Sequence, residues 1–145
     1  REKVILQDEF SAVSHRLITV TDDGSFGERG LVTDALRQLI DGGETYDEVI
    51  AIGPIPMMKY VSLLTAEYGI KTVVSMNPVM IDGTGMCGGC RLTVGGQVKF
   101  ACVDGPEFDG HQVDFDEVLQ RSRLYERQER HAYEATCNLL NKEVR

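Results

Sequence analysis

Strand-like and helix-like apolar patterns alternate through the first half of the chain. The strand-like runs are RLITVT, EVIAIG and KTVVSM, at 16–21, 48–53 and 71–76. Helical spacing of apolar residues occurs at Leu6, Phe10 and Val13, and again within 31–40 and 57–69. Strands that alternate with helices pair in parallel, because each helix returns the chain to the same end of the sheet. We therefore predict an α/β fold built on a partial parallel sheet.

The second half predicts a loop, a β-hairpin and a helical tail. Residues 77–90 are rich in glycine and typical of a loop, whereas RLTVGGQVKFAC is typical of a hairpin with Gly95-Gly96 as its two-residue turn. With that turn, residue 94 pairs with 97, and residue 90 lies opposite 101. Cys90 and Cys102 are therefore expected to be neighbours in space. The sequence after VDGPEF is charged and has helical spacing.

The composition limits the class of protein. A chain of 145 residues with 42% hydrophobic residues can bury the core of one domain, or of one domain with a small appendage. A formal net charge of -8 disfavours nucleic acid as a partner, because phosphate contacts need clustered Lys and Arg. No apolar run approaches the roughly 20 residues that cross a bilayer, and the N-terminus lacks a signal-peptide pattern. We therefore expect a cytoplasmic protein that does not insert into membranes.

Three of the four cysteines, Cys87, Cys90 and Cys102, lie close together in the sequence. Such grouping is typical of thiols that bind metal in a reducing compartment. Asp82 precedes them, so that the loop reads Asp-x4-Cys-x2-Cys, with Cys102 following the hairpin. This is the plant-type iron–sulfur spacing with Asp in place of the first Cys. Glycine at residues 83, 85, 88 and 89 favours the same interpretation, because a loop around a cluster needs positive φ angles and inward-facing N–H groups.

Two other interpretations of these thiols stay open. The three cysteines, joined by Asp82, His111 or Cys137, would complete a structural zinc site, although such sites more often combine two pairs of ligands. Alternatively, the segment is an ordinary glycine-rich loop with inert thiols. For Asp82 alone, the alternative to ligation is a loop cap that accepts hydrogen bonds from the backbone. Cys137 lies in the C-terminal helical pattern and is more typical of a packed apolar side chain than of a ligand.

A glycine-rich turn joins the first predicted strand to the next helix. In TDDGSFGERG, Gly24, Gly27 and Gly30 allow the backbone to approach a nucleotide, and Asp22 or Asp23 is suited to bind ribose hydroxyls. The spacing G-x-x-G-x-x-G differs from the dinucleotide fingerprint, however, and an ordinary turn explains it equally well.

The next strand ends in a second loop of the same kind. Gly53-Pro54 closes the strand, and Pro56 begins the helix, which leaves N–H groups of its first turn facing the sheet edge. Two neighbouring strand ends with such loops predict one shared ligand site. Met57 and Met58 follow at once, in positions more typical of core side chains than of ligand contacts.

Three segments together resemble a known family. TDDGSFGERGLVTD, IGPIPMM and MCGGCRLTVGGQVKFACVDGPEFDGHQVDFDE are similar to segments of the electron-transfer flavoprotein subunits of the ferredoxin–NADP reductase superfamily. The relevant branch includes electron-transfer subunits of dihydroorotate dehydrogenase, gamma subunits of sulfhydrogenase and the small subunit of bifurcating NADH-dependent ferredoxin–NADP oxidoreductase. The resemblance covers the C-terminal half of the family's chain. The flavin-binding barrel, the first strand and the first glycine-rich turn of the nucleotide domain are not in this sequence.

The resemblance implies a redox function. In the complete protein, NAD(H) or NADP(H) exchanges electrons with FAD on the barrel, and FAD exchanges them with a [2Fe-2S] cluster; the partner is a larger flavin and iron–sulfur catalytic subunit. The fragment alone is expected to be inactive. The implied cluster ligands are Asp82, Cys87, Cys90 and Cys102. The implied nucleotide-binding residues are Thr21, Asp22, Asp23, Gly24, Ser25, Gly27, Gly53, Pro54, Pro56 and Met57.

We accordingly divide the chain into three predicted parts. Residues 1–77 form a partial nucleotide-binding domain, 78–110 the iron–sulfur loop and hairpin, and 111–145 a C-terminal helical segment. The competing hypothesis is a non-catalytic interaction module braced by zinc, in which the acidic C-terminal helix docks to a partner.

Overall fold

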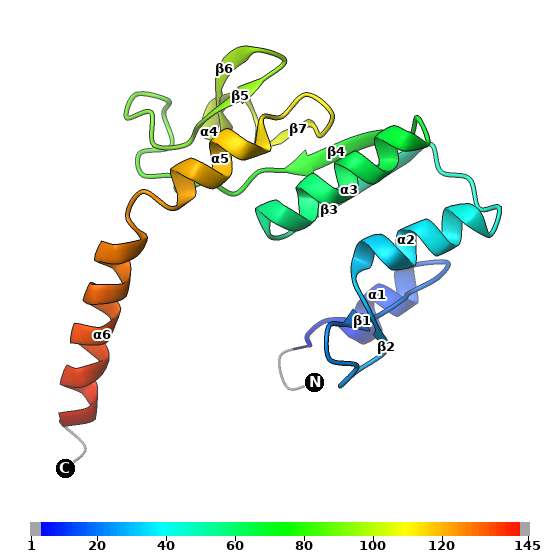
Figure 1. Cartoon of the computed structure of the whole chain (residues 1–145), viewed down its shortest axis with the longest axis horizontal. Helices are drawn as coiled ribbons and strands as arrows, with labels where there is room; N and C mark the ends of the chain where they lie inside the picture. The colour runs from blue at the N-terminus through cyan, green and yellow to red at the C-terminus, as the bar shows by residue number, and fades with distance from the viewer. Residues whose placement is uncertain (1–3, 143–145) are drawn as a thin grey trace.

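The centre of the molecule is a three-stranded sheet with a helix against it (Figure 1). In the computed structural model, which describes residues 4–142 and side chains through residue 135, the strand order is β3-β4-β7. β3 (Glu48–Ile52) and β4 (Lys71–Ser75) are parallel and are joined through α3 (Ile55–Glu67). The α/β fold and this parallel pair are confirmed. β7 (Glu107–Asp109) adds an antiparallel strand after the hairpin, which the sequence analysis did not predict.

The β-hairpin has the predicted register. β5 (Arg91–Val94) and β6 (Gln97–Phe100) pair Val94 with Gln97 and Arg91 with Phe100. The second strand is shorter than expected, because Ala101 and Cys102 begin the short helix α4 (Ala101–Asp104). The Asp104 carboxylate accepts the N–H of Phe100 at 2.7 Å and so favours the change from strand to helix at this point.

The hydrophobic core lies between α3, the central sheet, the hairpin and α5 (Phe115–Ser122). Met58, Val74 and Leu92 are completely buried. All side chains classed as buried within the described part of the chain fall between Ala51 and Val118. The core therefore joins the central sheet to the cysteine-bearing hairpin.

The N-terminal part is built differently. α1 (Gln7–Val13) forms at the predicted position, yet Phe10 is 56% exposed and Val13 84% exposed. Among the described residues, β1 (Val20–Thr21) pairs only with β2 (Glu28–Arg29), in a small parallel sheet separate from β3-β4-β7. The strand expected over 16–21 is thus limited to two residues, because the described part of the chain offers residues 16–19 no neighbouring strand to complete a ladder. α2 (Val32–Asp41) follows and contacts α3.

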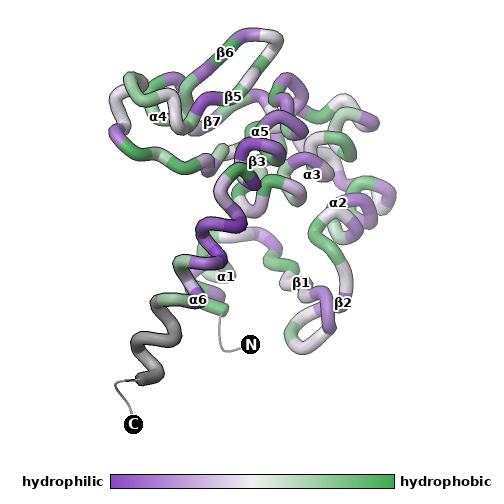
Figure 2. The backbone as a smooth tube through the Cα atoms, turned by 60° about the vertical axis from the view of Figure 1, so that its left-hand side comes forward, coloured by the Kyte–Doolittle hydropathy of each residue, from purple (hydrophilic) through white to green (hydrophobic). Residues whose placement is uncertain are grey.

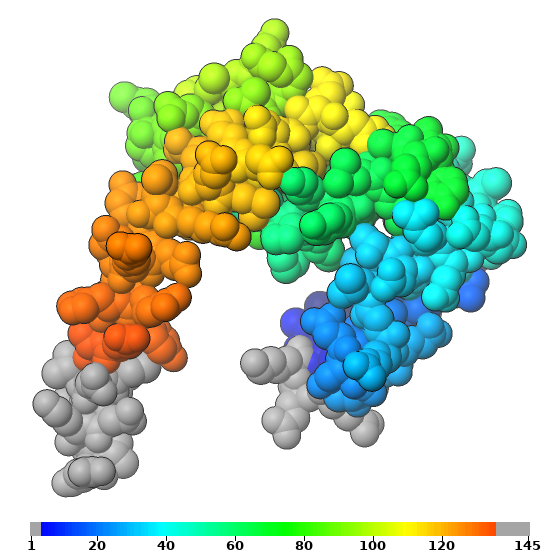
Figure 3. Space-filling model, in the orientation of Figure 1, coloured from blue at the N-terminus to red at the C-terminus, as the bar shows by residue number. Residues whose placement is uncertain are grey.

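The C-terminal helical pattern forms two helices instead of one. α5 ends at Ser122, and α6 (Glu126–Lys142) begins after a short break. In Figures 1 and 3, α6 extends away from the sheet and the hairpin. The side chain of Cys137 lies outside the described residues. Among the described residues, no helix has the length and apolar character needed to cross a membrane.

Candidate functional site

The hairpin brings two cysteine side chains together. The Sγ atoms of Cys90 and Cys102 lie 3.3 Å apart. Cys90 directly precedes β5, Cys102 lies in α4, and the backbone N–H of Ala101 donates to the Cys90 carbonyl at 3.2 Å. Cys90 is only 2% exposed. The predicted convergence of this pair is therefore confirmed, and its cause is the two-residue turn that sets the register.

The Asp82 carboxylate organises the loop that carries Cys87. Its Oδ1 accepts the N–H of Thr84 at 2.9 Å, and its Oδ2 accepts the N–H of Cys87 at 2.8 Å. The bond from Thr84, followed by that from Cys87, holds the pKa of Asp82 below its ordinary value, since both bonds favour the charged form. The carboxylate is thus an anion beside Cys87.

Backbone N–H groups also approach the sulfur atoms. The N–H of Gly89 lies 3.4 Å from Cys87 Sγ. The hydrogen bond with Cys90, together with burial, raises the pKa of Cys102, whereas the backbone N–H of Gly85 opposes that rise. Gly85 and Gly88 have φ values of 80° and 68°, a region that favours glycine. Gly85 therefore combines a positive φ with an N–H directed at a thiol, whereas the predicted role of these glycines around a cluster stays a prediction.

The four predicted ligands lie in this one loop and hairpin, but they do not form a tight shell. Among the described residues, no three Cys, His, Asp or Glu side chains converge as a single metal ion would require. His111, one of the residues considered for a zinc site, has its Nε2 atom 3.1 Å from Thr65 Oγ1 on α3. The arrangement thus consists of a close thiol pair and a neighbouring Asp82–Cys87 pair.

The glycine-rich turn after β1 is held by its own polar side chains. Thr21 Oγ1 donates to the Phe26 carbonyl at 2.8 Å, and the Asp23 carboxylate accepts the N–H of Ser25 at 2.9 Å. The bond from Ser25 lowers the pKa of Asp23. Gly24 and Gly27 have φ values of 71° and 70°. Several residues predicted to contact a nucleotide therefore shape the turn in this structure.

A cavity of about 700 Å³ lies where this turn meets α2 and α3. It brings together Asp22 from the end of β1 with Pro54, Pro56 and Met57 from the start of α3. Residues from both strand-end loops thus line one cavity, although β1 and β3 belong to separate sheets; that a ligand binds there stays a prediction. The other predicted nucleotide residues, Thr21, Asp23, Gly24, Ser25, Gly27 and Gly53, do not line it.

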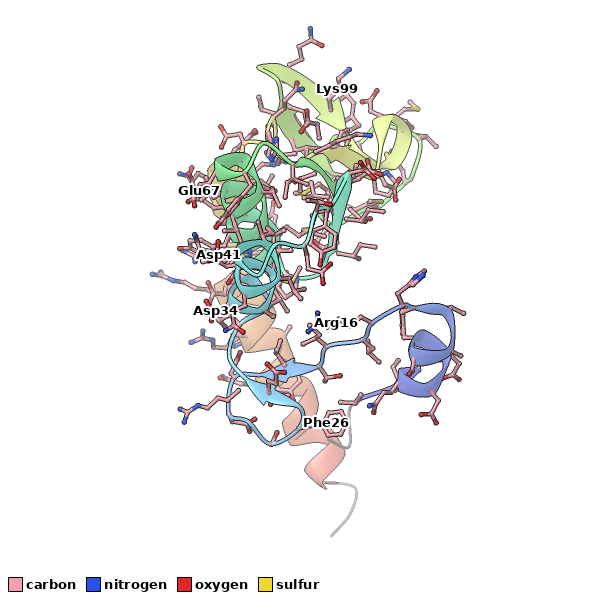
Figure 4. All side chains as sticks on the ribbon, turned by 90° about the vertical axis from the view of Figure 1, so that its right-hand side faces the viewer. Arg16, Phe26, Asp34, Asp41, Glu67 and Lys99 are labelled. Atoms are coloured by element: carbon pink, nitrogen blue, oxygen red, sulfur yellow. The ribbon has the colours of Figure 1, made fainter. Side chains whose placement is uncertain are left out.

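The cavity also has walls that the sequence analysis missed. Arg37 of α2 and Tyr60, Leu64 and Glu67 of α3 line it. Asp34 on α2 also lines it; Figure 4 labels Asp34 and Glu67 among the side chains of α2 and α3. The recurrence of Met57, Tyr60, Leu64 and Glu67 at helical spacing was the signal available in the sequence, since residues so spaced share one face of a helix. Met58, by contrast, is a core residue, as expected.

The segment that contains Cys87, Cys90 and Cys102 matches a known family of domains. Residues 77–114 match the iron-sulfur cluster binding domain of dihydroorotate dehydrogenase B. This range contains all four predicted cluster ligands.

Relatives match most of the chain. A protein of Thermotoga maritima, named as a homolog of the electron transfer subunit of dihydroorotate dehydrogenase B (NAD(+)), is 52% identical over 134 residues, which are 92% of this chain and 47% of that protein. A probable electron transfer subunit of the same enzyme from Methanocaldococcus jannaschii is 39% identical over 115 residues, which are 79% of this chain and 43% of that protein.

A solved structure of NADH-dependent reduced ferredoxin-NADP oxidoreductase, from work on flavin-based electron bifurcation, matches with a TM-score of 0.81 and 48% identity. The match covers 94% of this chain and 49% of that one. The chain therefore spans about half the length of the relatives it matches. The resemblance inferred from the sequence is confirmed: this chain is related to the electron transfer subunits of dihydroorotate dehydrogenase B and to NADH-dependent reduced ferredoxin-NADP oxidoreductase.

Proposed function

We propose that this chain is the nucleotide and [2Fe-2S] portion of an electron-transfer subunit that passes electrons between NAD(P)H, FAD and a catalytic partner. The 3.3 Å approach of the Cys90 and Cys102 sulfur atoms, beside the glycine-rich loop of Asp82 and Cys87, is the observation that carries the proposal. Grouped free thiols of this kind need a reduced setting, which supports a cytoplasmic location. The three-part division at residues 77 and 110 belongs to the same proposal.

The donor set fits an iron–sulfur cluster in its chemistry. Three thiols supply soft ligands, the Asp82 carboxylate supplies a harder one, and the N–H groups of Gly85 and Gly89 face the sulfur atoms. A bound cluster would supply one-electron transfer. The protein's own contribution is to hold Cys90 and Cys102 on the core and to present Asp82 and Cys87 from the glycine-rich loop. The match of residues 77–114 favours this function over the zinc-braced module.

The cavity between β1, α2 and α3, away from the cysteine loop, is proposed as the nicotinamide nucleotide site. Its volume of about 700 Å³ is within the range of ligand pockets. Asp22 would accept hydrogen bonds from ribose hydroxyls, and its charge, with that of Asp23, disfavours a 2′-phosphate. Pro54, Pro56 and Met57 form the apolar wall at the start of α3.

Metal and sulfide analysis tests the cluster half of the proposal. Chain reconstituted anaerobically with iron and sulfide is expected to be reddish brown and to contain about two iron and two acid-labile sulfide per chain, as a [2Fe-2S] cluster requires. Stoichiometric zinc without sulfide, in protein offered both metals, would instead support the zinc-braced module.

Variants of Asp82 test its role as a ligand. If Asp82 binds iron, Asp82→Cys retains the cluster with a shifted spectrum and reduction potential, because a thiolate is a softer donor than a carboxylate. Asp82→Ala is then expected to lose iron or to change the spectrum. Full iron with an unchanged spectrum and potential in Asp82→Ala would leave Asp82 as a loop cap only.

An activity assay tests the need for the flavin portion. A nicotinamide transfers a hydride, whereas a cluster accepts one electron at a time, so a flavin is needed between them. We expect negligible NADH-dependent dye reduction by this chain alone. Robust turnover without added flavoprotein would contradict the proposed division of labour.

A further inference from the structure

Arg121 of α5 reaches the turn between Cys87 and Cys90. Its Nη2 atom lies 3.5 Å from the carbonyl oxygen of Gly88. The same oxygen accepts the backbone N–H of Arg91 at 3.3 Å, which closes the turn from the other side. The Gly88 carbonyl is thus contacted both by its own turn and by a cation from a helix distant in sequence.

α5 is well fixed and can hold that cation in place. Phe115 and Val118 are 7% and 3% exposed in the core, and the Asp114 side chain accepts the N–H of Glu117 at 2.9 Å to cap the helix. Arg121 follows Val118 by three residues, so it lies on a neighbouring part of the same helix face. Its side chain is half-buried, whereas Arg123 is exposed.

The guanidinium is not engaged by an acidic side chain. None of the ion pairs within 4 Å in the described part of the chain includes Arg121, although Glu117 lies one helical turn earlier. Its charge is therefore directed to the cysteine turn without being neutralised by a close carboxylate. The interior beside the hairpin also screens charge less than bulk water does.

We propose that Arg121 is a positioning residue for the iron–sulfur site, which holds the Cys87–Cys90 turn and raises the reduction potential of the cluster. This inference rests on the proposed function. Reduction adds negative charge to a centre that already has anionic ligands, and a fixed cation nearby therefore favours the reduced form. Contacts outside the ligand set tune metal sites in this way.

The test compares Arg121→Gln, Arg121→Lys and Arg123→Gln in the full, reconstituted chain. Iron and sulfide content, the electron paramagnetic resonance spectrum of the reduced form, and the potential from a redox titration are measured for each. Arg121→Gln is expected to shift the ratio of oxidised to reduced cluster several-fold toward the oxidised form at a fixed potential; a tenfold shift would equal about 59 mV. Arg123→Gln removes the same charge from an exposed position and is expected to behave as wild type.

Arg121→Lys separates the two effects. It keeps the charge but not the shape of the guanidinium, so we expect partial recovery of the potential with an altered spectrum. Cluster loss in Arg121→Gln with retention in Arg123→Gln would support the positioning role directly. Equal potentials and spectra in Arg121→Gln, Arg123→Gln and wild type would overturn this inference while leaving the proposed function intact. A wild-type chain that takes up no iron would instead overturn the proposed function.

Discussion

The N-terminal segment (residues 4–50) and the central body (residues 51–118) are stabilised in different ways. The central body contains every described side chain that is classed as buried, including Met58 and Leu92 at 0% exposure. The N-terminal segment contains none, and its glycine-rich turn is held by hydrogen bonds among Thr21, Asp23 and their neighbours. Figure 2 shows this segment as short stretches of mixed hydropathy set apart from the hairpin.

The proposed cluster site and the proposed nucleotide site are therefore stabilised by different interactions. The Cys90–Cys102 pair is set on the apolar core, so its geometry depends on packing. The turn after β1 depends on backbone conformation and local polar contacts, which water competes for more readily. We therefore expect the cluster side to unfold as one cooperative unit and the nucleotide side to open locally at lower free energy.

The largest expected effect comes from the core of the central body. Met58→Ala removes a fully buried side chain and is expected to lower the free energy of unfolding by about 2–5 kcal/mol, because it leaves a cavity. Urea denaturation measures the loss. Phe10→Ala is the control in the N-terminal segment: at 56% exposure, the change should stay within about 0.5 kcal/mol. Equal losses in the two variants would refute the contrast.

The second prediction concerns backbone conformation in the N-terminal segment. Gly27 has φ of 70°, and a Cβ there would overlap the carbonyl oxygen of Thr19. Gly27→Ala is therefore expected to lower the free energy of local opening of this turn by about 1–3 kcal/mol. Amide exchange should accelerate at Glu28 and Gly30, whose N–H groups donate to Thr19 and Thr21, while the protection of the central body is retained.

Gly43→Ala is the matched control for that change. Gly43 also has a positive φ, of 95°, but a Cβ would meet no atom within 4 Å. Gly43→Ala should therefore show only the destabilisation caused by a positive φ at alanine, without the destabilisation caused by steric overlap of the Cβ. If Gly27→Ala accelerated exchange throughout Met58 and its core neighbours, the N-terminal segment would not be a separate unit.

The sequence was informative where short-range rules decide the structure. The Gly95-Gly96 turn fixed the hairpin register, and this alone was enough to predict that Cys90 and Cys102 meet. The parallel β3–β4 pair followed equally directly from the alternating patterns. Asp22 and Met57, predicted from two strand-end loops, do line one cavity, although β1 and β3 belong to separate sheets and not to the single sheet edge that the prediction assumed.

Features that depend on distant partners were not predicted. The run at 16–21 has strand-like side chains, but apolar spacing does not reveal whether a neighbouring strand is available, and only Val20–Thr21 forms a ladder. β7 is three residues long, too short for a pattern, and exists through its pairing with β4. Arg37 belongs to the cavity only because α2 packs against α3.

The third prediction concerns the attachment between the two regions. Arg37 Nη1 of α2 lies 3.3 Å from Glu67 Oε2 at the end of α3, and Tyr68 OH donates to Asp41 Oδ1 at 2.8 Å. Arg37→Gln should accelerate amide exchange in α2 by less than Gly27→Ala does in its own turn, because exposed ion pairs contribute little. The difference in α2 exchange rate between Arg37→Gln and wild type should become smaller as the salt concentration rises, because salt screens the Arg37–Glu67 ion pair.

Arg16→Gln provides the control for attachment. Arg16 pairs with Glu44 at 3.7 Å, and both residues lie inside the N-terminal segment. The change therefore removes an exposed ion pair of the same kind without touching the α2–α3 contact. A larger effect on α2 from Arg16→Gln than from Arg37→Gln would show that the Arg37–Glu67 pair does not link the regions.

The smallest effect on stability is expected at the boundary itself, on β3. Ile50 is 63% exposed in the middle of this strand, and within the described residues β3 lies at the edge of the sheet with β4 as its only partner. Because little apolar area is buried there, Ile50→Lys should change the free energy of unfolding by no more than about 0.5 kcal/mol. An exposed apolar edge strand nevertheless favours pairing between molecules, which a lysine opposes. Sedimentation velocity across a concentration series should therefore show less self-association for Ile50→Lys than for wild type.

Leu124→Lys, at a 62% exposed position between α5 and α6, makes the same change away from any strand. If it reduced self-association as much as Ile50→Lys, general surface hydrophobicity and not the β3 edge would be responsible.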